Sequence, residues 1–429
     1  MTLKEIRHEQ VGETLYYERM PNGLDVYVLP KPGFQKTYAT FATRYGSIDN
    51  HFRVDGGEKI KVPDGIAHFL EHKMFEEPQG DVFSQFASQG ASVNAYTSFE
   101  RTVYLFSATE QIDNNIESLL NFVQKPYFTD ENVEKEKGII AQEINMYKDH
   151  PDWQAYFGLI DAFYHVHPVH IDIAGTIESI NQITKEHLYE CYNTFYHPAN
   201  MLLFIVGAVD PQKTMLLVYD NQAKKKFPKQ GKIERFFDPE PPHIKLEKKV
   251  TRLPVAMPKC LFGFKETEVG LTGRQLLERE CETKLLLELL FGPSSELYQK
   301  LYDQKLINDS FSHEYSSHTG YAFSVIGGDT PDPERLLDTV QKELEMWRKQ
   351  GIQERDFERI RKKKIGSYMR MLNSLEAIAN EFTRHHFRDQ DLFDIPEVYQ
   401  NMTLENIHER FEQHCRWSQM AASIVTNDG

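Results

Sequence analysis

The segment His68-Phe69-Leu70-Glu71-His72 carries the residue types whose spacing is best suited to chemistry. On a helix, residues three and four positions apart lie on one face, so His68, Glu71 and His72 are expected to project together. Two imidazoles placed in this way can bind one metal ion, and a neighbouring carboxylate can take a proton from water, whose pKa the ion lowers to about 7. The alternative is a solvated helix face, because a chain with 17 histidines can carry such a pattern by chance.

A later segment offers a third ligand, since catalytic zinc usually has three protein ligands and one open position. Glu136 and Glu143 are separated by about two helical turns and therefore share a face of a predicted helix. The segment between them is partly apolar, and a carboxylate beside packed residues is costly unless it is paired or binds a metal. For either glutamate alone, a solvated surface position is the simpler interpretation.

Two predicted helices position these side chains. The first follows Pro63-Asp64-Gly65, and the second follows the capping residue Thr129 and extends over residues 130–147. The apolar positions expected to pack are Ile66, Phe69, Leu70 and Met74 in the first helix and Val133, Ile140 and Ile144 in the second.

Alternating apolar and polar residues predict strands near residues 15–17, 25–29, 37–42 and 92–107. Strands joined by turns and mixed with long helices indicate the α+β class, with mainly antiparallel sheets. Thr184 and Thr403 each begin a helix, and each lies 18 residues before an apolar strand. We therefore predict two similar domains, residues 1–224 and 248–429, joined by a linker over residues 225–247 that is rich in lysine and proline. A single shared offset also has a simpler explanation, which is chance.

The composition excludes several classes of protein. The 429 residues include 49 basic and 64 acidic side chains, so the formal net charge of −15 argues against nucleic acid and membrane partners. The four cysteines form no close pair and are expected to be reduced core residues. The amino terminus lacks the apolar segment of a signal peptide, and no apolar run approaches the ~20 residues of a membrane span. We expect a cytoplasmic protein.

The chain resembles the pitrilysin or insulinase family of inverted-zincin metallopeptidases, in which the motif has the order His-x-x-Glu-His. Within that family it resembles the bacterial subunits of single length that are related to the mitochondrial processing peptidase. Beside the pentapeptide and the glutamate pair, the resemblance rests on Asn94-Ala95-Tyr96-Thr97, Thr102-Val103-Tyr104, His167-Pro168, Gly175-Thr176-Ile177-Glu178-Ser179-Ile180 and Tyr196-His197-Pro198-Ala199-Asn200-Met201. These segments follow the family's order through most of the first half.

The resemblance implies a zinc-dependent endopeptidase. Its zinc ligands would be His68, His72 and Glu143, its general base Glu71, and Glu136 would assist without binding the ion. The family fold implies two similar domains that face each other across a chamber. The second half has no corresponding histidine pair, and its long helix over residues 356–372 has basic residues where the first half has its glutamates, so metal is expected only in the first half. The family fold also implies that Asn94 and Ala95 lie on an exposed edge strand, to which a peptide or an unfolded segment adds by main-chain hydrogen bonds.

One segment departs from the family pattern. Active relatives commonly carry an arginine and a tyrosine in the second half, whereas Tyr302 and Asp309 stand at the matching positions here. The loss of an oxyanion donor can cost a few kcal/mol of transition-state stabilisation. We therefore expect the zinc-bearing subunit of a heterodimer with a related metal-free subunit, or a homo-oligomer. The alternative is a non-catalytic assembly or peptide-holding subunit, against which the intact set of site residues argues.

Overall fold

A computed structural model describes residues 3–78 and 80–427, so residues 1–2, 79 and 428–429 of the two predicted domains lie outside the described part. The chain forms two compact units, each assembled from three stretches. Unit 1 consists of Met1–Ile144, Asp172–Phe237 and Met371–Phe387. Unit 2 consists of Asn145–Ile171, Asp238–Arg370 and Arg388–Gly429.

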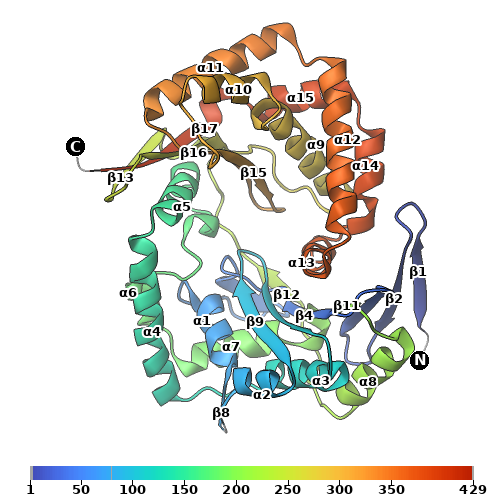
Figure 1. The fold of residues 1–429 in the computed structure, drawn as a ribbon. Coiled ribbons are helices and arrows are strands. Elements are labelled where there is room, and N and C mark those ends of the chain that lie inside the picture. Colours follow the sequence, from blue (N-terminus) through green and yellow to red (C-terminus); the bar gives the residue numbers. More distant parts are fainter. Residues whose placement is uncertain (1–2, 79, 428–429) are drawn as a thin grey trace. The chain divides into compact units, whose positions relative to one another are not determined.

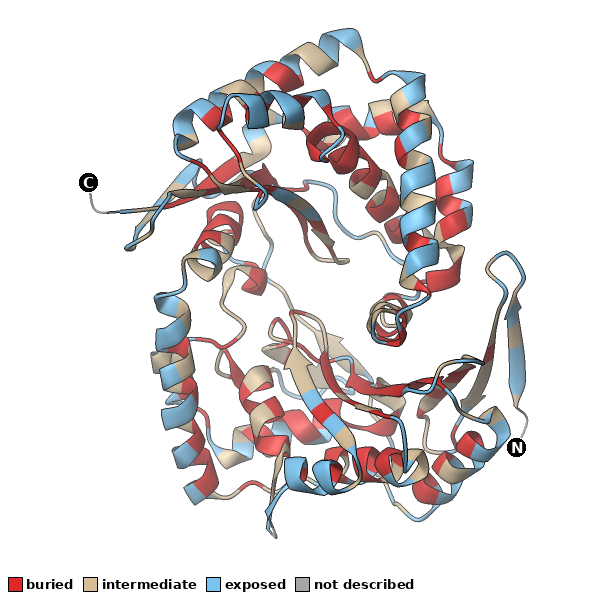
Figure 2. Ribbon diagram, viewed as in Figure 1, coloured by how far each residue is buried: buried red, intermediate tan, exposed pale blue. Residues whose placement is uncertain are grey.

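Unit 1 is built on a seven-stranded sheet (Figure 1). In spatial order its strands are β1 (Lys4–His8), β2 (Glu13–Arg19), β3 (Asp25–Pro30), β11 (Met201–Gly207), β4 (Thr37–Thr43), β10 (Thr102–Ala108) and β9 (Ala91–Thr97). Neighbours are antiparallel except β3 and β11, which are parallel. The central strands β4 and β11 are buried at every position, as the red ribbon in Figure 2 shows.

Unit 2 repeats the core of this topology. Its strand order is β13 (Lys248–Arg252), β17 (Met420–Thr426), β14 (Lys259–Phe264), β16 (Ala322–Asp329) and β15 (Ser312–Ser317). Only β13 and β17 are parallel, and they match β3 and β11. The predicted α+β class, with two similar and mainly antiparallel halves, is therefore confirmed.

The internal repeat is visible in the two helices that precede the matching strands. Helix α7 (Lys185–Phe195) leads to β11, and α15 (Leu404–His414) leads to β17. Each is capped by the predicted threonine, Thr184 or Thr403, in a reciprocal capping box. The two helices have equal lengths, and the strands that follow them lie between corresponding neighbours, β3 and β4 in the first sheet and β13 and β14 in the second.

The two halves exchange one helix each. Helix α5 (Pro151–Phe163) belongs to the first half of the sequence but packs on β13, β14 and β17 of unit 2. Helix α13 (Leu375–His386) belongs to the second half but packs on β4 and β11 of unit 1, where the Phe204 and Phe382 rings stack 4.3 Å apart. The compact units are therefore not contiguous in sequence, and the domain boundary at residues 225–247 stays a prediction.

The predicted linker is anchored at both ends. Strand β12 (Ile233–Arg235) pairs with β5 (His51–Val54) in unit 1, and β5 also pairs with β6 (Ile60–Lys61). In unit 2, the Glu240 carboxylate accepts hydrogen bonds from the backbone N–H groups of residues 165–167 and from Lys265 Nζ at 2.7 Å. Although burial opposes it, this set of donors lowers the pKa of Glu240 to about 2.

The two predicted site helices form as expected. Helix α1 spans Ile66–Met74 and α4 spans Asp130–Lys148, and all seven predicted apolar positions are buried. All seven belong to the hydrophobic core of unit 1. Further helices of unit 1 are α2 (Val82–Ser88), α3 (Ile112–Val123), α6 (Ile177–Ile180) and α8 (Pro211–Ala223), and those of unit 2 are α9 (Gly273–Phe291), α10 (Glu296–Asp303), α11 (Pro333–Gln350), α12 (Glu354–Met371) and α14 (Ile395–Asn401).

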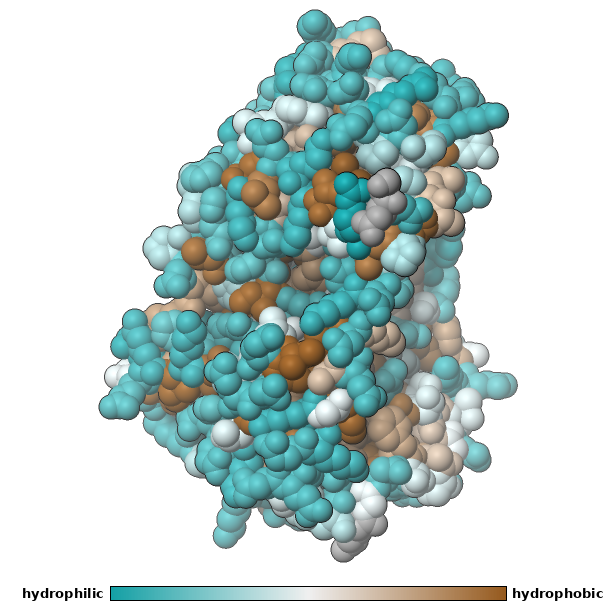
Figure 3. All heavy atoms as spheres, turned by 90° about the vertical axis from the view of Figure 1, so that its left-hand side faces the viewer, coloured by the Kyte–Doolittle hydropathy of each residue, from teal (hydrophilic) through white to brown (hydrophobic). Residues whose placement is uncertain are grey.

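Hydrophobic side chains on the face drawn in Figure 3 are scattered among hydrophilic ones. Among the described residues, no helix is long and apolar enough to cross a bilayer.

Gly65 sets the start of α1, the helix that carries the pentapeptide. Its φ of +86° is rarely adopted by residues with a side chain, and a Cβ there would lie 2.4 Å from the Ala174 carbonyl oxygen. Gly12 has a similar φ of +70° but no heavy atom within 4 Å of its would-be Cβ.

We predict that Gly12→Ala lowers the free energy of unfolding by about 1 kcal/mol, because alanine rarely adopts this φ. Gly65→Ala should lower it by about 1–3 kcal/mol more than Gly12→Ala does, because of the additional clash. Urea unfolding followed by circular dichroism checks this, and equal losses in both variants would contradict it.

Glu240 gives a prediction about acid stability. Its pKa is lower in the folded chain than in the unfolded chain, so its contribution to stability is complete above the ordinary carboxyl pKa of about 4.5 and is lost as the pH falls towards 2. Glu240→Gln also leaves the buried Lys265 ammonium without its carboxylate, so the loss at pH 7 should be about 3 kcal/mol. Thermal unfolding at pH 7 and pH 3 should show a smaller difference between wild type and variant at pH 3. Glu268→Gln, at an exposed ion pair in the same unit, should change little at either pH.

Candidate metal centre

The structure brings His68, His72 and Glu143 together at the contact between α1 and α4. One ligand atom from each lies within 4.8 Å of the other two, and among the described residues this is the only group of three or more His, Cys, Asp and Glu side chains with such geometry. His68 Nε2 lies 3.7 Å from one oxygen of Glu143, and His72 Nε2 lies 3.6 Å from the other. The side chains are 13%, 27% and 21% exposed in that order, so the cluster is partly open to solvent.

These donors fit a zinc ion. Bond lengths of about 2.0–2.1 Å in a tetrahedral site place ligand atoms roughly 3.3 Å apart. His68 and His72 each approach a different oxygen of Glu143 at a separation a few tenths of an ångström above that value, and all three ligand atoms lie within 4.8 Å of one another. Side-chain rotations that bring the three atoms closer together would complete the ligand set. Two imidazole nitrogens and one carboxylate oxygen are also a ligand set known for catalytic zinc, with a fourth position left open.

Glu71 lies on α1 between the two histidines and is 7% exposed. Burial raises its pKa, while the hydrogen bond from the Thr97 hydroxyl to its Oε2, 2.6 Å long, opposes the shift. The neighbouring Thr102 hydroxyl donates to the Tyr45 carbonyl, so the Thr97 proton is directed at Glu71. The Thr97 hydroxyl therefore holds one oxygen of the Glu71 carboxylate in place.

Glu136 is not part of the three-residue cluster but contacts one of its members, His72. Its Oε1 is 3.0 Å from His72 Nδ1, and its Oε2 is 3.5 Å from the Nζ of Lys73. Burial alone would raise the pKa of Glu136, but the interactions with His72 and Lys73 prevail and lower it. The same hydrogen bond raises the pKa of His72 against the effect of burial. A carboxylate on the far nitrogen of a ligating imidazole fixes the ring and makes it a better ligand.

The surroundings of His68 shift its pKa in the opposite direction to that of His72. Burial lowers its pKa to about 3, with a smaller effect from His72, so its imidazole is neutral at neutral pH. The two rings lie edge to face with centroids 4.5 Å apart. Neutral imidazole is the form that binds metal.

Asn94 and Ala95 lie on β9, the last strand of the first sheet. Among the described strands β9 pairs only with β10, so its other edge is unpaired. Asn94 is exposed, and its Oδ1 accepts the N–H of Ala95 at 2.9 Å. An added strand would have to replace this local hydrogen bond. Tyr96, next on β9, donates to Asn380 of α13 at 2.9 Å, so the exchanged helix supports the edge strand.

Sequence reasoning missed two site residues, Lys73 and Thr97. Lys73 directly follows the pentapeptide, and a lysine on a predicted helix gives no sign that it is buried. Thr97 stood within a matched segment, but its bond to Glu71 depends on the packing of α1 against β9.

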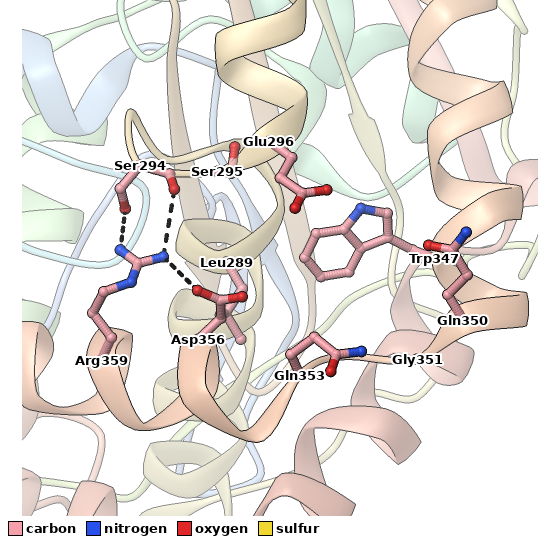
Figure 4. A pocket seen from close by; sticks show the side chains of 10 residues that line it. All are labelled: Leu289, Ser294, Ser295, Glu296, Trp347, Gln350, Gly351, Gln353, Asp356 and Arg359. Carbon is pink, nitrogen blue, oxygen red and sulfur yellow. Dashed lines mark hydrogen bonds and ion pairs between the residues drawn. The ribbon is translucent and has the colours of Figure 1, made fainter.

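A separate pocket of about 350 Å³ lies in unit 2, between the ends of α9, α10, α11 and α12 (Figure 4). Its wall includes the Trp347 ring, with Glu296 nearby. Arg359 in this wall is engaged by Ser294 at 2.6 Å and by Asp356 at 3.1 Å, so the charged group that could bind an anion is already paired. No metal-ligand geometry occurs among the described residues there.

Comparison with known proteins assigns the family. Residues 54–177 match the model described as insulinase, peptidase family M16, and residues 182–364 match that of the peptidase M16 inactive domain. The uncharacterized zinc protease YmfH of Bacillus subtilis is 52% identical over 412 residues, which cover 96% of each chain. The chain belongs to peptidase family M16.

Solved M16 structures agree with this assignment. The crystal structure of an M16-like peptidase from Alicyclobacillus acidocaldarius matches with a TM-score of 0.94 at 44% identity, covering 100% of this chain and 99% of the other. Pitrilysin shares the fold, with a TM-score of 0.75 at 14% identity over 46% of its length. The resemblance inferred from the site motifs is confirmed at the level of the family.

The geometry predicts that zinc binding depends on Glu143. Glu143→Gln removes a charged donor from the cluster and should weaken zinc binding roughly 100-fold or more, because the loss of a ligand costs more than the loss of its support. The matched control is Glu134→Gln on the same helix, whose side chain is 69% exposed. Competition with a chromophoric chelator measures both affinities. Zinc should raise the melting temperature of wild type and control but not of Glu143→Gln, and equal affinities in all three would exclude this site.

Proposed function

We propose that the chain is a zinc-dependent endopeptidase that hydrolyses peptides or unfolded segments. The observation that carries this proposal is the buried Glu71 carboxylate beside a cluster of three ligands from two helices. Membership of family M16 and the zinc protease names of its relatives support it. In this proposal residues 1–224 carry the chemistry, with His68, His72 and Glu143 as zinc ligands.

Glu71 would act as the general base and then as the acid. A zinc ion held by the cluster would supply Lewis-acid chemistry and lower the pKa of water to about 7. The carboxylate of Glu71, held by the Thr97 hydroxyl, would take the proton of the attacking water and pass it to the leaving amine. Burial removes Glu71 from bulk solvent, and the bond from Thr97 fixes its carboxylate, so the base is held in one position for this role.

The unpaired edge of β9 would align the substrate. An extended peptide can add there as a further strand, with Asn94 releasing the Ala95 N–H to the incoming carbonyl. Main-chain pairing selects for extended conformation more than for particular side chains. This favours short peptides and unfolded segments over folded proteins.

A partner would complete the site. Tyr302 and Asp309 are exposed in unit 2, and neither is an arginine able to stabilise a developing oxyanion. We propose that the chain pairs with a related metal-free subunit, or with a second copy, that supplies such donors. The rival function is a peptide-holding or assembly subunit. The combination of Glu71 with the cluster of three ligands argues against it, because holding a peptide requires neither a metal site nor a base beside one.

Glu71→Gln tests the proposed function. The variant keeps the shape of the side chain and all three ligands, so zinc content should stay at one ion per chain. Cleavage of unfolded peptides should fall at least about 100-fold because the proton acceptor is lost. Both proteins are assayed alone and mixed with a related metal-free M16 subunit.

Each outcome of that assay has a separate meaning. Unchanged cleavage by Glu71→Gln would refute the assigned base. Full activity of the wild-type chain alone would refute the heterodimer, and zinc binding without cleavage in every mixture would favour the rival function.

A further inference from the structure

Lys73 is a fully buried lysine whose charge faces the metal centre. It follows His72 on α1, and its side chain is 0% exposed. Its Nζ lies 3.5 Å from Oε2 of Glu136 and forms an ion pair with Glu76 of β7 (Glu76–Glu77), a short strand paired with β8 (Gly80–Asp81). A buried lysine is costly unless its charge is balanced, so such a position needs a specific partner.

The two oxygens of Glu136 are held by consecutive residues of α1. Oε1 pairs with His72 Nδ1 at 3.0 Å and Oε2 with Lys73 Nζ at 3.5 Å. One contact would leave the carboxylate free to turn about its last bond, whereas two contacts fix its plane. The orientation of the His72 ring depends on that plane, because Glu136 is the partner of its far nitrogen.

We propose that Lys73 is a positioning residue of the metal centre, which holds Glu136 so that Glu136 can keep the His72 ring aimed at the ion. The proposal rests on the proposed function only in taking zinc as the ion. Lys73 has a second ion pair, with Glu76, which joins α1 to β7. The proposed role depends only on the contact with Glu136, because Glu136 is the residue that contacts the ligand His72.

A double-mutant cycle on zinc affinity tests the role. Chelator competition is measured for wild type, Lys73→Met, Glu136→Gln and the double variant. Each single substitution should weaken zinc binding by about tenfold or more, as expected for the loss of support to a ligand. The double variant should bind within about threefold of Glu136→Gln, since Lys73 acts through Glu136 and the effects cannot add. Glu76→Gln, the matched control that removes the other partner of Lys73, should bind within about threefold of wild type.

Folding is checked by the circular dichroism and melting temperature of each zinc-free protein. If Lys73→Met does not fold, Lys73→Gln replaces it, because an amide can still pack and removes the charge. The double variant loses both members of a buried ion pair and is expected to fold.

The outcomes separate this proposal from the proposed function. Unchanged or tighter zinc binding by the Lys73 variant would overturn the positioning role, as would fully additive losses in the double variant or an equal loss in Glu76→Gln. A wild-type protein that binds no zinc would overturn the zinc assignment itself. A wild-type protein that binds zinc but cleaves nothing would overturn the peptidase while leaving the role of Lys73 intact.

Discussion

The contact between α1 and α4 requires several polar and charged groups to be buried side by side. Each desolvated carboxylate or imidazole opposes folding unless it gains a partner. The partners are specific: Thr97 for Glu71, and His72 with Lys73 for Glu136. Below this polar layer, the apolar faces of both helices belong to one hydrophobic core, which supplies the favourable free energy that offsets the cost.

The second half also contains a buried glutamate, and basic side chains balance its charge. Helix α9 contacts β15 as α1 contacts β9, and Glu280 bonds to Ser317, the last residue of β15, at 3.2 Å. Glu71 bonds in the same way to Thr97, the last residue of β9. Around Glu280 the counter-charges are Lys284 and Arg388. The bond from acid to hydroxyl is thus a feature of the shared architecture, and the histidine pair distinguishes the first half.

The sequence predicted those parts of the site that depend on local periodicity. Spacing placed His68, Glu71 and His72 on one helix face, and the capping threonines marked both repeats, because these features depend on residues a few positions apart. It did not predict the exchange of α5 and α13. That exchange depends on which sheet a helix reaches after α4 or α12, a contact between residues far apart in the sequence that local periodicity does not encode. Strand β12, only three residues long, likewise forms because β5 is present to pair with it.

The two imidazoles are oriented by different interactions: His72 by a hydrogen bond to a carboxylate, and His68 by packing in the buried part of α1. His72 keeps its Nδ1 proton in a hydrogen bond to Glu136, so its Nε2 is the free nitrogen and its ring has one defined orientation. The buried Nδ1 of His68 has no hydrogen-bond partner among the described residues, and its ring is held by packing and kept neutral by desolvation. A ligand oriented by a charged acceptor is strong but competes with a proton, whereas one oriented by packing is weaker but available over a wide pH range. The structure combines one of each with the carboxylate of Glu143, so among the residues that support a ligand, those behind His72 should affect metal affinity most.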